Sequence, residues 1–113
     1  AELDTLLLSA TINEIQQYLM ATKTSSRELA LYYLQRIQAY DWNILNSVIE
    51  LNPKILDIAD RLDQERAQGI SHGPMHGIPI LLKDNIAATG MHATAGAWAM
   101  RDWQPDRDAA LVK

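Results

Sequence analysis

One lysine stands out because it ends an otherwise apolar run of the chain. Residues 80–82 are Ile, Leu and Leu, and Lys83 follows them directly. An apolar run without alternation is typical of a strand that is covered on both faces, and functional sites gather at strand ends in open α/β sheets. A lysine in such a poorly hydrated place is disfavoured as a cation, so its pKa would fall toward that of a general base. The alternative is that Lys83 leaves the sheet and points into water.

The other polar residues give little indication of a metal or cofactor site. His72 and His76 are four residues apart, but Gly73 and Pro74 lie between them, so the two rings do not share a helical face. His92 lies further along, no carboxylate stands at a recognised ligand spacing, and the chain has no cysteine. The glycines match neither phosphate-loop pattern. We therefore expect solvated or hydrogen-bonded histidines, no metal ligand and no cofactor-binding residue.

The composition excludes several classes of protein. The chain has 113 residues, with 10 Lys plus Arg against 14 Asp plus Glu and a formal net charge of −4. This mild negative balance argues against a nucleic-acid partner, which would favour a basic face. No apolar run approaches the ~20 residues of a membrane span. Position 1 is Ala instead of Met, which indicates a trimmed N-terminus; we slightly favour a cytoplasmic location, and a secreted or periplasmic one stays open.

Two capping boxes predict helices in the first part of the chain. Thr11 stands three residues before Glu14, and Ser25 stands three residues before Glu28. Apolar residues follow each box at helical spacing, which predicts a helix of about three turns and then a longer one that ends near Tyr40. Joined by a short polar turn, the two helices form a helical hairpin region over residues 1–45. One apolar stripe of this hairpin could serve a homodimer contact.

The rest of the chain indicates an α/β core that begins at residue 46. Residues 46–51 are short and β-branched, which predicts a strand. Asn52 and Pro53 favour the start of a helix, and Gly69 is its expected C′ residue. A second strand is predicted at residues 80–82. The expected fold class is therefore α/β, a mixed β-sheet flanked by helices.

The last residues indicate that this sheet is incomplete. Pro105 and Asp106 favour the start of a further helix, and the chain stops at Lys113, about two turns later. Two strands are too few to bury a sheet. We therefore interpret residues 1–113 as the N-terminal part of a single larger domain. The alternative is a small two-layer α+β domain.

The segment around the lysine resembles a known enzyme family. Residues 73–86 (Gly-Pro-Met-His-Gly-Ile-Pro-Ile-Leu-Leu-Lys-Asp-Asn-Ile) closely resemble the catalytic-lysine segment of amidase signature enzymes. Those enzymes hydrolyse or transfer amides with a Ser–cis-Ser–Lys triad. Weaker similarity extends over nearly the whole chain, at residues 24–37, 46–51, 90–96 and 105–112. The wording of residues 76–83 is nearer to the peptide-amidase kind than to the corresponding chain of the tRNA-dependent amidotransferase.

The resemblance implies that Lys83 is the catalytic base of the triad. In the family, neutral lysine accepts a proton through the bridging serine, which activates the nucleophilic serine for formation of an acyl-enzyme. The stretch that carries both serines would lie beyond Lys113, so the chain alone is expected to be inactive. One departure is visible, because many relatives have Ser where this chain has Ala97. This change affects a hydrogen bond of that hydroxyl and leaves the triad intact.

The expected function is therefore amide hydrolysis, without a metal or an organic cofactor. The expected partners are a small-molecule or peptide amide as substrate and the remainder of the amidase polypeptide. One alternative is the amide-cleaving (A-type) chain of a tRNA-dependent amidotransferase, which would need protein partners and an ammonia acceptor. Another is a non-catalytic fragment or interaction module in which Lys83 is inert.

Overall fold

The computed structural model describes residues 2–113, and the chain divides into two compact units that alternate along the sequence. The first unit comprises Ala1–Tyr40 and Lys54–Pro79, and the second comprises Asp41–Pro53 and Ile80–Lys113. No helix among the described residues is long and apolar enough to cross a bilayer.

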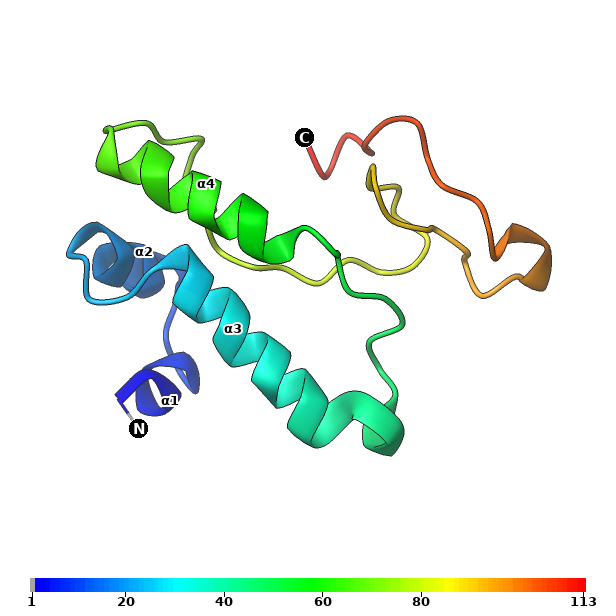
Figure 1. The fold of residues 1–113 in the computed structure, drawn as a ribbon, viewed down its shortest axis with the longest axis horizontal. Helices are drawn as coiled ribbons and strands as arrows, with labels where there is room; N and C mark the ends of the chain where they lie inside the picture. The colour runs from blue at the N-terminus through cyan, green and yellow to red at the C-terminus, as the bar shows by residue number, and fades with distance from the viewer. Residues whose placement is uncertain (1) are drawn as a thin grey trace. The chain divides into compact units, whose positions relative to one another are not determined.

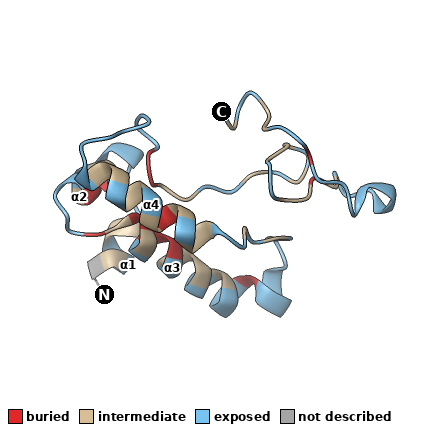
Figure 2. Ribbon diagram, turned by 45° about the horizontal axis from the view of Figure 1, so that its top comes forward, coloured by how far each residue is buried: buried red, intermediate tan, exposed pale blue. Residues whose placement is uncertain are grey.

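The first unit is built from four α-helices. They are α1 (Glu2–Leu7), α2 (Ile12–Met20), α3 (Ser26–Arg36) and α4 (Ile55–Ala67). Helices α3 and α4 run side by side in opposite directions (Figure 1). The core lies where Ile15 and Leu19 of α2 meet Leu29 of α3, and the buried residues of these helices are seen in Figure 2. Burial of three such side chains contributes about 1.5–3 kcal/mol each.

Both predicted capping boxes are present. The Thr11 hydroxyl accepts a hydrogen bond from the Glu14 backbone N–H (3.3 Å), and the Glu14 carboxylate accepts one from the Thr11 N–H (2.7 Å). Ser25 and Glu28 make the same reciprocal pair at 3.1 and 3.0 Å. The helices α2 and α3 are therefore confirmed. Helix α1 was not predicted; its Leu3 packs against the core cluster.

The end of the long helix also agrees with the prediction. After α3 the chain continues as a π-helical segment over Ile37–Leu45, which is interrupted by non-helical dihedral angles at Trp42 and Asn43. The buried carboxylate of Asp41 accepts hydrogen bonds from the backbone N–H groups of Ser47 (2.8 Å) and Val48 (3.0 Å). The Ser47 hydroxyl also donates to it. These hydrogen bonds, first that of the Ser47 hydroxyl, lower the pKa of Asp41.

Helix α4 confirms the prediction at its C-terminal end. It ends at Ala67, and Gly69 follows with φ +79°, a left-handed conformation that favours glycine. Its N-terminal cap position is Lys54 and not Asn52, so the helix begins two residues later than the Asn-Pro signal indicated.

The prediction of an α/β fold is wrong for this structure. Residues 2–113 contain helices and turns and no β-strand, and both predicted strands, 46–51 and 80–82, are neither helical nor paired. A strand exists only when its backbone N–H and C=O groups bond to a neighbouring strand. β-branched and apolar residues favour an extended chain, but they do not supply that neighbour.

The helix predicted from Pro105 and Asp106 is also absent, because residues 105–113 form bends and turns. The carboxylate that matters is that of Asp108, which accepts hydrogen bonds from the backbone N–H (2.7 Å) and the hydroxyl (3.0 Å) of Thr89. The Ala109 N–H donates to the Ala87 carbonyl at 2.9 Å. Such side-chain and loop bonds compete with a helix for the same backbone.

Candidate active site

Lys83 lies in the second unit, at the start of a tight turn. Its carbonyl oxygen accepts a hydrogen bond from the Ile86 N–H at 2.9 Å. The residue is exposed, and no side chain among residues 2–113 makes a hydrogen bond or an ion pair with its ammonium group. Residues 2–113 therefore do not supply the desolvation that the sequence suggested for this amine.

The residue after the lysine fixes the loop that follows. The Asp84 carboxylate accepts a hydrogen bond from the Thr94 backbone N–H (3.0 Å) and another from the Thr94 hydroxyl. The Ala95 N–H donates to the Asp84 carbonyl at 3.1 Å. Hydrogen bonds, first that of the Thr94 hydroxyl and then that of its N–H, lower the pKa of Asp84. Asp84 is therefore ionised near neutral pH, and Thr94 occupies its carboxylate.

The loop held by Asp84 has a strained backbone. Ala95 has φ +50° and Gly96 has φ +73°. The Gly96 N–H donates to the Thr94 hydroxyl at 3.2 Å, and the Ala97 N–H donates to the Thr94 carbonyl at 2.9 Å. A left-handed non-glycine residue costs about 1–2 kcal/mol, so the bonds around Thr94 must hold Ala95 in place. Strain of this kind gathers at functional sites.

A second polar group in the same unit is centred on His92. The Glu50 carboxylate accepts from the His92 backbone N–H and contacts its Nδ1, both at 3.0 Å. The Gln104 amide nitrogen lies 3.1 Å from His92 Nε2. A proton on Nδ1 satisfies all three contacts, because Nε2 can then accept from Gln104. His92 is thus hydrogen-bonded, as expected from the sequence.

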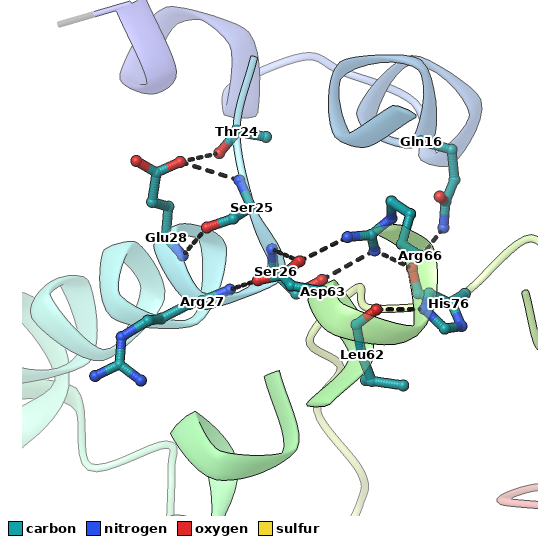
Figure 3. Close-up of polar contacts among 10 residues, drawn as sticks. All are labelled: Gln16, Thr24, Ser25, Ser26, Arg27, Glu28, Leu62, Asp63, Arg66 and His76. Carbon is teal, nitrogen blue, oxygen red and sulfur yellow. Dashed lines mark hydrogen bonds and ion pairs between the residues drawn. The ribbon is translucent and has the colours of Figure 1, made fainter. Parts of the chain in front are cut away.

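The approach to the lysine segment is anchored in the first unit by a polar network (Figure 3). The Asp63 carboxylate of α4 accepts from the backbone N–H groups of Ser26 (2.8 Å) and Arg27 (3.1 Å) at the start of α3. Arg66 donates to Asp63 (2.6 Å), to the Ser26 hydroxyl (3.0 Å) and to the His76 carbonyl (3.2 Å). Burial raises the pKa of Asp63, but these hydrogen bonds outweigh it and lower the pKa overall.

Gly77 closes this network, because it has φ +79° and lies directly against it. A Cβ at this position would overlap the Ser26 hydroxyl and the Arg66 guanidinium, so only glycine fits. The Gln16 amide nitrogen donates to the carbonyls of Pro74 (2.8 Å) and His76 (2.9 Å). The glycine-rich corner before Lys83 is therefore held by α2, α3 and α4 together.

The two neighbouring histidines also lie in the first unit, with a carboxylate beside them. Their rings stack, with centroids 5.3 Å apart and an angle of 18° between the ring planes. The Nε2 of His72 is 2.9 Å from a carboxylate oxygen of Glu65. His76 is buried, and its Nε2 lies 2.9 Å from the Leu62 carbonyl. Sequence spacing did not indicate Glu65, because α4 and the following turn bring it back to the histidines.

The sequence indicated Lys83 but not the bonds that hold its surroundings. The Asp84–Thr94 pair spans ten residues and the Glu50–His92 pair spans 42. The only local signal for the first pair was a carboxylate directly after the lysine, followed by a threonine in a loop of small residues.

Comparison with known proteins agrees with the resemblance of the lysine segment. A family model described as Amidase matches residues 28–113. The crystal structure of native peptide amidase from Stenotrophomonas maltophilia is 44% identical, with a TM-score of 0.87, and the match covers 92% of this chain and 22% of that one. A Schizosaccharomyces pombe protein with amidase in its name is 41% identical over 109 residues, 95% of this chain and 18% of that protein.

The similarity to amidotransferases is lower. The A-type chain of the glutamyl-tRNA(Gln) amidotransferase of Moorella thermoacetica is 31% identical over 103 residues, 91% of this chain and 21% of that protein. The chain spans about a fifth of the length of the curated relatives that it matches. With a family model that matches most of its length and peptide amidases among its similar structures, the chain belongs to the amidase signature family.

Proposed function

We propose that the protein to which this chain belongs hydrolyses amides, and that Lys83 is its catalytic base. The observation that carries the proposal is the family match over residues 28–113, which includes the lysine segment. The surroundings of Lys83 support it, because Asp84 is occupied by Thr94 and so does not hold the lysine in an ion pair. A lysine free of a carboxylate can lose its proton more easily than one in a salt bridge.

In the proposed mechanism the neutral amine of Lys83 takes the proton of a bridging serine, which takes the proton of a nucleophilic serine. The nucleophile's oxygen attacks the amide carbon, the C–N bond breaks, and the amine leaves with a proton returned from the lysine. Water then hydrolyses the acyl-enzyme by the same proton path. Both serines belong to the remainder of the polypeptide, so this chain contributes the base and the loop beside it.

The proposed substrates are peptide or small-molecule amides that release ammonia. The higher identity to peptide amidase, 44% against 31% for the amidotransferase chain, favours hydrolysis without protein partners. An amidotransferase would need its whole complex to use the ammonia productively. Ammonia released from a peptide amide by the purified full-length protein, in the absence of any partner, distinguishes the two functions.

The catalytic role of Lys83 is tested by Lys83→Ala in the full-length protein. We expect kcat to fall by about 10²–10⁴-fold, the usual contribution of a general base, with an unchanged melting temperature because the side chain is exposed. Lys113→Ala, which removes another exposed lysine of the same unit, serves as the control and should keep full activity. Full turnover by Lys83→Ala would refute the assignment.

A further inference from the structure

We propose that Glu65, His72 and His76 form a binding site for a divalent transition-metal cation, with Zn²⁺ as the best match. One ligand atom from each of the three residues lies within 4.8 Å of the others. Two ligands bound at about 2.1 Å to a tetrahedral zinc ion are roughly 3.4 Å apart. The three side chains therefore need only small movements to meet at one cation. This site lies in the first unit and is separate from the proposed amidase chemistry.

The donor types favour zinc over the hard cations. Two imidazole nitrogens and one carboxylate oxygen make a His₂Glu set, which zinc proteins use with a fourth, open position. Imidazole suits Zn²⁺, Cu²⁺ and Ni²⁺, whereas Mg²⁺ and Ca²⁺ select oxygen ligands. With only one carboxylate among the three donors, magnesium and calcium are poor matches.

The hydrogen bonds of His76 already select the nitrogen that would bind the metal. Its Nε2 lies 2.9 Å from the Leu62 carbonyl, which can only accept, so Nε2 carries the proton. Nδ1 therefore carries a lone pair, which at present accepts a long hydrogen bond of 3.2 Å from the His72 backbone N–H. Metal-bound histidines characteristically donate their other ring N–H to a carbonyl or carboxylate. His76 has this arrangement within the chain itself.

The remaining two ligands have the freedom to complete the site. The His72 side chain is 63% exposed, so its ring can turn away from the stacked position and bring a nitrogen toward Nδ1 of His76. Turning is required because a cation must lie near the plane of each ring, and stacked rings have no such common point. Glu65 already contacts His72 at 2.9 Å. A cation would replace the shared proton of that contact.

The backbone around the cluster is fixed before any cation arrives. The Ile70 N–H donates to the Glu65 carbonyl at 2.9 Å, which ties the loop after α4 to the helix. At the other end, Gln16 and Arg66 donate to the His76 carbonyl. A cation held by α4 and this loop would therefore stabilise an arrangement that the polar network already favours.

The test is calorimetric titration of ZnCl2 into tag-free, chelator-treated full-length protein. We expect one site per chain in the wild type and binding at least about tenfold weaker in both His72→Ala and Glu65→Gln, since each removes a ligand. His92→Ala, which removes the histidine of the second unit, is the matched control and should bind like the wild type. Loss of zinc binding in His92→Ala, or its retention in His72→Ala, would overturn the assignment.

Two further readouts separate a bound metal from a folding defect. Zn²⁺ should raise the melting temperature of the wild type and not that of His72→Ala, because a cation that binds only the folded state stabilises it by mass action. Co²⁺ in place of Zn²⁺ should give visible absorption bands in the wild type alone. His72→Ala is preferred to a His76 variant because His72 is exposed. Absence of any zinc-dependent shift in the wild type refutes the proposal, as does an equal shift in His72→Ala.

Discussion

At the residue scale, the question at Lys83 is what the carboxylate next to it in the sequence does. A carboxylate beside a lysine usually holds it in the charged form. Here the Asp84 oxygens are occupied by the backbone N–H and the hydroxyl of Thr94. The same pair holds the left-handed backbone of Ala95 next to the lysine segment. Thr94 thereby acts on Lys83 through Asp84, as a positioning residue and not a catalytic one.

We therefore expect Thr94→Val, which keeps the shape of the side chain and removes its hydroxyl, to lower kcat for amide hydrolysis by about 10- to 100-fold. The reason is that small displacements of a catalytic group cost activity on this scale, and the freed Asp84 can pair with Lys83. A steeper loss toward low pH than in the wild type would reveal such a pairing, because it holds the lysine charged.

Thr89→Val is the matched control for this change. Thr89 donates its N–H and hydroxyl to Asp108 in the same unit, as Thr94 does to Asp84, but next to a different carboxylate. It should lose stability without the change in pH profile. Equal kinetic effects of the two valine variants would show that Thr94 is only structural.

At the element scale, the start of α3 is stabilised in two different ways. One is the local capping box of Ser25 and Glu28, three residues apart, which the sequence alone predicted. The other is the Asp63 carboxylate from α4, which accepts from the N–H groups of Ser26 and Arg27. This second cap spans 36 and 37 residues, and no local pattern announces it. The helices could thus be predicted, but the contact that holds α3 to α4 could not.

The Asp63 cap makes a prediction about pH. Its folded-state pKa is lowered, so its contribution is present above the ordinary aspartate pKa of about 3.9 and is lost as pH falls through that value toward the lower folded pKa. Asp63→Asn should reduce the free energy of unfolding at pH 7 by about 1–3 kcal/mol. The difference from the wild type should shrink below about pH 4, as measured by urea denaturation. Asp57→Asn, an exposed position on α4, should show no such convergence.

Gly77 tests the packing of the polar network against the helices. Gly77→Ala should strongly destabilise the chain, by about 1–2 kcal/mol for the left-handed backbone plus the cost of displacing Ser26 and Arg66. Gly69→Ala is a close control, because Gly69 has the same φ of +79° and open space around its Cβ position. The difference between the two melting temperatures isolates the contact from the backbone strain. Equal losses would mean that Gly77 is needed only for its conformation.

At the scale of the whole molecule, the two units are held by different forces. The buried apolar residues Ile15, Leu19, Leu29, Ala30 and Ala59 all belong to the first unit, and Ala93 is the buried apolar residue described in the second. The second unit relies on polar contacts such as Asp84–Thr94 and Glu50–His92. Periodicity in the sequence predicted the helical core well because helices are local. It failed for the predicted strands, which need a partner to be strands at all.

This difference predicts unequal local stability within the chain. Amide hydrogen exchange should be slowest in α3 and α4, whose N–H groups lie in helices that bury apolar residues, and faster across residues 80–113. Polar contacts alone contribute about 0.5–1.5 kcal/mol each and compete with water, so the second unit should open without the first. The Thr94 and Ala95 N–H groups, both bonded to Asp84, should be the slowest of that unit. Uniform protection across both units would contradict this division of forces, since it would require the second unit to unfold only together with the helical core.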